Sequence, residues 1–335
     1  MPLLLTITLL AAAPTQACTF FKITQGERTM VGNNEDAWGL EPWIHFVPGR
    51  DGRHGVAYVG HRDGLPQGGM NDAGLVFDGL TVPAKAMHAQ TARSPVPGTF
   101  PFLERILGEC ASIADVQHLL GRYDWTSMSQ AMIVFVDRAG NYLVMEGDTV
   151  IIGNEASYVA GNFRPSQCTD LDSVSIPRFQ QGRAYLAAHG DTSLRSCVGM
   201  MEAMKACRKK FGEGTLYTSI YDLQQGLVHL CFYHDFAHLR TFDLQAELAK
   251  GDHTVMMTAL FSPNAEYQRL ARYHTPFNTS WMRWGLLACA LYAAIMGLYA
   301  LIGVFRVLRN WKTRRAQLLN TLLLGVASMI AVVLV

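Results

Sequence analysis

The stretch Cys18–Asp36, CTFFKITQGERTMVGNNED, sets the fold of this chain. Its first half is rich in β-branched and aromatic residues, and Gln25 and Gly26 supply turn chemistry before a second short run, Thr29–Gly32. Two such runs on either side of a glycine-containing turn predict a β-hairpin. We therefore expect an antiparallel hairpin that begins at Cys18.

The residues before Cys18 have the pattern of an export signal. An apolar run from Leu3 to Ala13 is followed by a short polar stretch and the small residue Ala17. This order predicts a signal peptide over residues 1–17 and cleavage just before Cys18, although no Lys or Arg precedes the apolar run. A buried N-terminal strand or helix is the alternative interpretation.

The other end of the sequence carries a membrane pattern. Trp284–Phe305 is an uncharged apolar stretch of about 22 residues, enough for a helix to cross ~30 Å of hydrocarbon. A second apolar stretch, Leu318–Val335, has roughly 18 residues. Between them lie the basic residues Arg306, Arg309, Lys312, Arg314 and Arg315. We expect residues 284–335 to form a two-helix transmembrane hairpin whose basic turn is cytoplasmic, which places the preceding domain on the periplasmic or extracellular side.

The composition excludes some classes of protein. Of 335 residues, 50% are hydrophobic and 16% are charged, which argues against disorder as the main state. The net charge of +1, with no basic stripe, gives no electrostatic reason to expect a nucleic-acid partner. His234 and His238 have the spacing of a helical metal pair but lie among strand-like residues, so we expect no metal site.

The pattern between residues 18 and 262 alternates short strands with helices. Further strands are expected at 75–82, 131–136, 142–146, 216–223, 227–233 and 240–244, and helices at 102–123, 178–189 and 192–210. Gly108 is expected to divide the first helical segment in two. This order predicts an α+β domain over residues 18–262, with helices layered on antiparallel sheets, and a polar juxtamembrane segment over 263–283.

Cys18 is the residue best suited to carry chemistry. The sequence contains no GxSxG, HExxH, Walker or GxGxxG motif. After cleavage Cys18 would own both a thiol with a pKa near 8.5 and an α-amine with a pKa of about 7.7 to 8.0. The amine can then act as the base for its own nucleophile, without a partner histidine. A lipid-modified cysteine or a merely structural cysteine are the alternatives.

Six short segments, taken in order, resemble the choloylglycine hydrolase and penicillin V acylase family of linear-amide hydrolases. They cover about residues 18–244, and each matches a motif of that family. The segments are Cys18–Phe21 with Gly32–Asp36 (GNNED), Gly69–Leu75 (GMNDAGL), Gly79–Thr81 (GLT), Ala160–Phe163 (AGNF), Ser175–Phe179 (SIPRF) and Leu216–Leu223 (LYTSIYDL).

The resemblance implies a fold and a set of roles. The fold would be the four-layer αββα sandwich of N-terminal nucleophile hydrolases, with no metal or organic cofactor. Cys18 would attack an amide carbonyl, held in place by Asp36, while Asn162 and the backbone N–H of Thr81 face the oxyanion. Arg178 would supply positive charge that favours the thiolate. Two further residues of the matched motifs are candidates for the oxyanion or substrate site, Asn34 and Asn71, although the latter lies in strong turn chemistry.

One residue departs from the family pattern. The family has an arginine where this sequence has Asn33, so a charge that lowers the thiol pKa is missing. The primary interpretation remains a hydrolase of small-molecule N-acyl amides, tethered to the lipid bilayer. An acyltransferase that uses an amine acceptor, and a membrane-anchored binding protein that has lost catalysis, are the alternatives. The sequence does not identify the acyl group.

We expect the mature protein to begin with a free Cys18, because both the cleavage pattern and the chemistry require it. N-terminal sequencing of the exported chain measures this directly. A blocked N-terminus, or one at any other residue, would remove the self-activating cysteine from the scheme.

Overall fold

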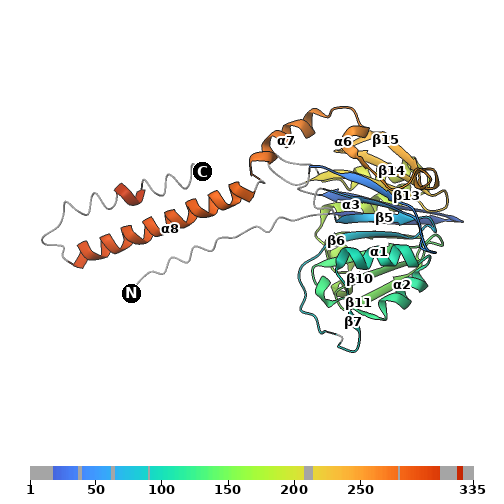
Figure 1. Cartoon of the computed structure of the whole chain (residues 1–335), viewed down its shortest axis with the longest axis horizontal. Helices are drawn as coiled ribbons and strands as arrows, with labels where there is room; N and C mark the ends of the chain where they lie inside the picture. Colours follow the sequence, from blue (N-terminus) through green and yellow to red (C-terminus); the bar gives the residue numbers. More distant parts are fainter. Residues whose placement is uncertain are drawn as a thin grey trace. The chain divides into compact units, whose positions relative to one another are not determined.

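The computed structural model describes residues 18–36, 40–61, 65–89, 91–206, 214–277, 280–309 and 323–326, with the backbone alone described for 272–277, 280–283 and 307. The chain divides into two compact units, with the boundary between Asn264 and Ala265. The first unit contains two large antiparallel sheets and the helices that cover them (Figure 1). The expected signal peptide, residues 1–17, lies outside the described residues.

The first sheet, as far as the structure describes the chain, has six strands. In spatial order they are β12 (Ser157–Ala160), β1 (Thr19–Gln25), β2 (Arg28–Asp36), β13 (Thr215–Asp222), β14 (Leu227–Phe232) and β15 (Asp235–Asp243). The expected hairpin is present as β1 and β2, joined by a turn in which Gly26 has φ 57°. Glycine adopts this left-handed conformation without steric cost, so the turn forms where the sequence indicated.

The second sheet has eight strands among the described residues. In spatial order they are β11 (Thr149–Gly153), β10 (Tyr142–Glu146), β9 (Ala131–Val136), β6 (Val76–Thr81), β5 (Pro66–Asn71), β4 (Val56–Gly60), β3 (Trp43–Val47) and β16 (His253–Met256). A short parallel pair, β7 (Ser94–Pro95) and β8 (Tyr123–Asp124), lies outside both sheets.

Helices cover one face of each large sheet. Against the second sheet lie α1 (Thr99–Glu109) and α2 (Ile113–Leu120), and against the first lie α3 (Pro177–His189) and α4 (Leu194–Ala203) (Figure 1). Shorter elements are α5 (Leu244–Leu248), α6 (Met257–Leu260), η1 (Thr126–Met128), η2 (Pro165–Gln167) and η3 (Leu171–Ser173). The α+β class expected from the sequence is therefore confirmed, because each sheet buries one face against helices.

Alternation along β1 and β2 separates two buried layers. Phe21, Ile23 and Met30 pack with Phe179 of α3 in the apolar core between the first sheet and its helices. Because successive side chains point to opposite faces of a strand, Cys18, at the start of β1, belongs to the opposite face, toward the second sheet. Cys18 therefore lies on the face of the first sheet that meets the second.

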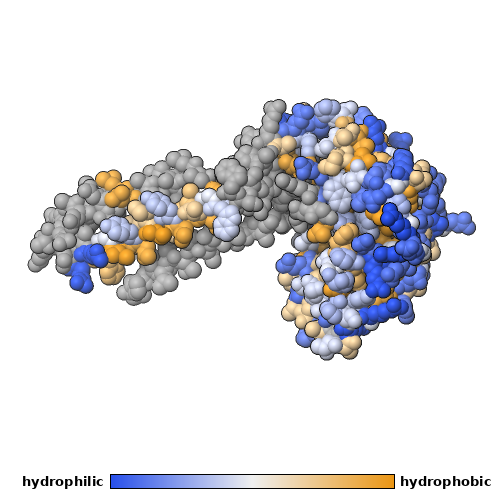
Figure 2. All heavy atoms as spheres, viewed as in Figure 1, coloured by the Kyte–Doolittle hydropathy of each residue, from blue (hydrophilic) through white to orange (hydrophobic). Residues whose placement is uncertain are grey.

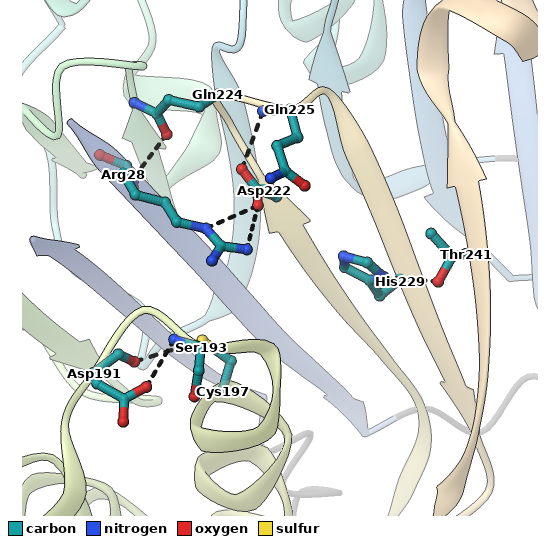
Figure 3. Close-up of polar contacts among 10 residues, drawn as sticks. Arg28, Asp191, Ser193, Cys197, Asp222, Gln224, Gln225, His229 and Thr241 are labelled. Carbon is teal, nitrogen blue, oxygen red and sulfur yellow. Dashed lines mark hydrogen bonds and ion pairs between the residues drawn. The ribbon is translucent and has the colours of Figure 1, made fainter.

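An ion pair fixes the end of the hairpin that lies away from Cys18. Figure 3 shows the Arg28 guanidinium reaching the Asp222 carboxylate, whose Oδ2 lies 2.6 Å from Arg28 Nη2. The other oxygen of this buried carboxylate accepts the backbone N–H of Gln225, in the turn after β13. These contacts tie the start of β2 to the end of β13, while His229 Nδ1 pairs with Thr241 Oγ1 across β14 and β15 (Figure 3).

The second unit contains α7 (Ala265–Phe277) and α8 (Ser280–Arg309). Within α8, the 23 residues Trp284–Arg306 are long and apolar enough to cross a membrane by length and composition. Large apolar side chains are exposed along this helix, and Figure 2 shows them as orange atoms. Of the second apolar stretch, residues 323–326 are helical and the rest lies outside the described residues, so a two-helix hairpin stays a prediction.

One detail of the sequence interpretation was wrong. Gly108 does not divide a helix, because it lies inside α1, and the break falls at the following residues, where Ser112 caps α2. The Ser112 hydroxyl accepts the backbone N–H of Asp115, and the Asp115 carboxylate in turn accepts the Ser112 backbone N–H. This reciprocal capping box, not a glycine, sets the start of the second helix.

We expect Gly32→Ala to lower the free energy of unfolding by about 1–3 kcal/mol, because an added Cβ collides with the ring of Phe21, which is fully buried. Chemical denaturation of the full chain in detergent measures the change. Gly161→Ala is the matched control, since its nearest heavy atom would lie 3.7 Å away. Equal stability of the two variants would contradict this account of the hairpin.

Candidate active site

Strand register places Cys18 and Glu35 opposite one another at one end of the first sheet. β1 pairs with β2 so that Thr19 faces Asn34, and continuing this register by one residue places Cys18 opposite Glu35. On its other side β1 pairs with β12, with Phe20 opposite Ala160, and Asn162 follows two residues after the end of β12. Neighbouring residues in antiparallel strands share a face, so these side chains gather at one end of the sheet.

Cys18 itself is buried and contacts a carboxyl group. Its Sγ lies 3.3 Å from Oε2 of Glu35, and the residue is 3% exposed. Burial raises the pKa of the thiol well above its usual value, and the nearby carboxyl groups of Glu35, Asp36 and Asp78 raise it further. A hydrogen bond from the Asp36 backbone N–H to the sulfur lowers the pKa of the thiol. The thiol as it stands is therefore protonated at neutral pH.

Glu35 is an acid held in its neutral form near pH 7. It is 4% exposed, and burial raises the pKa of its carboxyl to about 8, with the charge of Asp36 adding to the effect. The contacts with Cys18 and with Asn33 Nδ2, at 3.5 Å, lower this pKa but do not offset burial. The carboxyl can therefore gain or lose a proton near physiological pH.

A second acid reaches the same layer from the other sheet. Asp78, on β6, is fully buried, and neither carboxyl oxygen has a hydrogen-bond partner among the described residues. Its position between the sheets follows from Gly68 on β5, where a Cβ would lie 2.6 Å from Asp78 Oδ2 and 3.4 Å from the hydroxyl of Tyr221 on β13. Burial first, and then the charge of Glu35, raise the pKa of Asp78 well above its usual value.

Tyr217 completes what we call the inter-sheet cluster, defined as Cys18, Asn33, Glu35, Asp78 and Tyr217. It faces Glu35 across β2 and β13, is fully buried, and its hydroxyl has no hydrogen-bond partner within the described residues. Burial, with the charges of Glu35 and Asp78, raises the pKa of this phenol. The cluster thus combines a thiol, an amide, two carboxyl groups and a phenol in a buried layer.

Asp36 and Arg178 meet beside the cluster. Arg178, in the first turn of α3, places Nη1 2.6 Å from Oδ2 of Asp36, whose other oxygen accepts the hydroxyl of Thr215 at 2.8 Å. The residue Asp36 is 1% exposed. The structure therefore brings Arg178 to Asp36, and the group of Asp36 that meets the Cys18 sulfur is its backbone N–H. The guanidinium of Arg178 forms its ion pair with the Asp36 carboxylate and is not among the groups that shift the pKa of the Cys18 thiol.

Asn162 and Thr81 also come together. Nδ2 of Asn162 donates a hydrogen bond of 2.7 Å to the backbone carbonyl of Thr81, at the end of β6. This bond links the first sheet to the second at the Cys18 end. A primary amide carries two N–H groups, so one can hold Thr81 while the other serves a ligand. The expected pair of oxyanion residues therefore shares one location.

Asn34 and Asn71 are not brought to Cys18, and we reassign both to holding the fold. Asn34 points to the helical face, where Nδ2 donates to the Met201 carbonyl at 2.9 Å and Oδ1 accepts the Thr218 hydroxyl at 2.6 Å. The physical reason is alternation, since Asn33 and Glu35 occupy the opposite face of β2.

The side chain of Asn71 points toward α1. Its Nδ2 donates to the carbonyls of Leu107 and Cys110, each at 2.8 Å, and its Oδ1 accepts the backbone N–H of Leu75. The amide therefore spans the turn between β5 and β6 and the end of α1. These three bonds anchor the helix to the second sheet, on the face away from the inter-sheet cluster.

Among the described cysteines, Cys18 is the one whose sulfur is hydrogen-bonded to a carboxyl oxygen. Burial raises the pKa of Cys197 to about 12, and its sulfur contacts a backbone carbonyl, that of Asp191, at 4.0 Å (Figure 3). Cys110 and Cys231 are likewise buried with a pKa of about 12. Cys18 is set apart by its position just before β1, where its sulfur meets Glu35.

Sequence reasoning missed Glu35, Asp78 and Tyr217. Glu35 lies inside the GNNED segment, and period-2 alternation from Asn33, combined with the hairpin register, would have placed it beside Cys18. Asp78 is an acid within the apolar run Val76–Thr81, which is itself a signal, because a charged residue in a buried strand requires an explanation. Tyr217 leaves no comparable mark, because tyrosine is common in strands.

Comparison with solved structures identifies the fold. Two variants of the conjugated bile acid hydrolase from Clostridium perfringens match with TM-scores of 0.57 and 0.56 at 16% sequence identity, covering 74% of this chain and 97% of theirs. Penicillin V acylase from Agrobacterium tumefaciens matches with a TM-score of 0.53 at 13% identity, covering 68% of this chain and 86% of its own. The chain therefore shares the fold of these amide hydrolases. No protein-family model and no curated protein sequence matches it.

We expect the stability of the protein to fall as pH rises through about 8. The folded-state pKa of Glu35, about 8, lies above its ordinary value of 4.5. The contribution of Glu35 to the free energy of unfolding is therefore complete below pH 4.5 and is lost as the pH rises to about 8. At ~1.4 kcal/mol for each pKa unit the loss amounts to a few kcal/mol. Denaturation of the full chain in detergent from pH 5 to 9 measures it.

Glu35→Gln should flatten this pH dependence, because glutamine stays neutral throughout. Glu202→Gln on α4 is the matched control, as its side chain is 54% exposed. Identical pH dependence in the wild type and in Glu35→Gln would contradict the assignment of Glu35 as a buried neutral acid.

Proposed function

We propose that the mature chain is an extracytoplasmic hydrolase of linear N-acyl amide C–N bonds that uses Cys18 as its nucleophile. The observation that carries the proposal is the contact of the buried Cys18 Sγ with Glu35 Oε2 at one end of the first sheet. This contact lies in a fold shared with two enzymes whose names describe amide cleavage, a conjugated bile acid hydrolase and a penicillin V acylase. Fold alone does not specify an activity, so the residues carry the argument.

The residues suit acyl transfer to sulfur. The Cys18 thiol attacks the amide carbonyl, and the resulting thioester is resolved by water, which regenerates the thiol. The second N–H of Asn162 stabilises the oxyanion, and loss of such a donor typically costs about 10²–10³ in rate. The Asp36 backbone N–H, held by the pair of Asp36 with Arg178, stabilises the thiolate.

The α-amine of Cys18 becomes available when residues 1–17 are removed. With a pKa of about 7.7 to 8.0 it can accept a proton near neutral pH, as in other N-terminal nucleophiles. Helix α8, with its 23-residue apolar window, would hold the enzyme at a lipid bilayer, and the basic residues that follow favour a cytoplasmic turn. This topology agrees with an exported hydrolase domain.

A second candidate is a membrane-anchored binding protein that keeps the fold without turnover. It is favoured by Asn33, which replaces the family's arginine, and by the raised pKa of the buried Cys18 thiol. Such a protein would bind N-acyl amides between its sheets without forming a thioester. Detection of a covalent acyl adduct on Cys18 by intact mass separates the two functions.

We expect Cys18→Ala to abolish amide turnover and Cys18→Ser to reduce it by at least about 10³-fold, because both remove the thiolate. Release of free acid from a panel of bile salts, phenoxyacetyl penicillins, acyl-homoserine lactones and N-acyl amino acids measures the effect. Cys197→Ala is the matched control, since this buried cysteine belongs to α4 and lies outside the inter-sheet cluster. Failure to cleave any panel member, or turnover that survives Cys18→Ala, would overturn the proposal.

A further inference from the structure

The thioester mechanism proposed for Cys18 gives no role to one contact within the inter-sheet cluster. Glu35 Oε2 lies 3.3 Å from Cys18 Sγ, and the hydrogen bond runs from the thiol to the carboxyl. The contact is built into the sheet, because the register of β1 and β2 places these residues opposite one another. It also exists in the full chain, where residue 18 still follows Ala17 and has no free amine.

The surroundings of Glu35 are acidic or neutral on every side that the structure describes. The titratable groups that face it are Cys18 from β1, Asp36 from β2, Tyr217 and Tyr221 from β13 and Asp78 from β6. No lysine or arginine is among the described groups that shift its pKa. An ionised Glu35 is therefore not neutralised by a partner, and it is a strong proton acceptor whenever it carries charge.

We propose that Glu35 is a catalytic residue that accepts the Cys18 thiol proton and passes it to the departing nitrogen. This inference rests on the proposed function, since it concerns the same nucleophile. As the sulfur forms its bond to the carbonyl carbon, the proton moves from Sγ to Oε2. When the C–N bond breaks, Glu35 gives that proton to the nitrogen, which leaves as the amine. Thiol and amide are converted to thioester and amine, with the carboxylate restored.

The geometry suits both transfers. A general base must lie within hydrogen-bond reach of the proton that it takes, and one whose pKa is near the working pH both accepts and returns protons efficiently. The distance of 3.3 Å between sulfur and oxygen meets the first condition. Burial raises the pKa of Glu35 to about 8, which meets the second. The α-amine is thereby left to position the substrate or to serve the water step.

The alternative is that Glu35 takes no proton and only makes the Cys18 thiol less reactive. A carboxylate that kept its charge beside the sulfur would disfavour the thiolate, so that removing the charge would make Cys18 more reactive. A carboxylate that takes the proton has the opposite effect, because its removal leaves the thiol without an acceptor. The two roles therefore predict changes of opposite sign in the same variant.

The test is the rate at which iodoacetamide alkylates Cys18 between pH 5.5 and 9.5, followed by peptide mass in the full chain in detergent. For the wild type we expect the rate to rise through about pH 8, as Glu35 ionises. Glu35→Gln should be at least tenfold slower at pH 8.5 and should lack this rise. Glu35→Asp, which keeps a shorter carboxyl, should fall between them, and Glu202→Gln on α4 should match the wild type.

Three results would overturn the inference. Faster alkylation of Glu35→Gln would show that the carboxyl opposes the thiolate, an unchanged rate and profile would show that it plays no part, and a Cys18 that reacts at no pH would show that no base serves it. Near-UV circular dichroism at pH 5 verifies that Glu35→Gln is folded, because at this pH residue 35 is neutral in the wild type as well as in the variant.

Measurement of amide turnover distinguishes failure of the proposed role of Glu35 from failure of the proposed function. Turnover that survives Cys18→Ala removes the proposed function, whatever the alkylation rates are. Turnover that requires Cys18, with an unchanged rate and pH profile in Glu35→Gln, removes only the role of Glu35.

Discussion

Antiparallel register in the first sheet is the constraint on which the candidate site depends. Backbone pairing of β1, β2 and β13 places Cys18, Glu35 and Tyr217 at one level across three strands. A slip of one residue in any pair would turn these side chains to the helical face. The Arg28–Asp222 ion pair at the other end of the hairpin opposes such a slip, because it ties β2 to β13.

The inter-sheet cluster also shows what the fold tolerates in order to keep these groups together. Glu35 and Asp78 are both buried without a cationic partner among the described residues, an arrangement that costs stability unless the acids stay protonated. Buried acids with shifted pKa values concentrate at functional sites, where the shift sets the reactivity. A purely structural layer between two sheets would be filled with apolar side chains, as the helix-facing layers of this protein are.

Much of the fold could be predicted from local patterns, but the site could not be completed from them. The hairpin at Cys18, the helix over 178–189 and the strand over 75–82 follow from turn chemistry and apolar runs, and each is present within a few residues. The sequence analysis did not predict the strands β3, β4 and β5, which lie in a Gly- and Pro-rich stretch, because their pairing is set by the rest of the second sheet. Asp78 and Asn71 needed three-dimensional information, since sequence does not reveal which face of a strand meets a helix.

The empty side-chain position at Gly68 has an evolutionary consequence. Asp78 occupies the volume that a methyl group at residue 68 would fill, at 2.6 Å from one carboxyl oxygen. Chains that descend from the same ancestor can therefore keep the acid only where they also keep the glycine. Substitutions at the two positions should be correlated across an alignment, and a lineage with alanine at residue 68 should have replaced the aspartate as well.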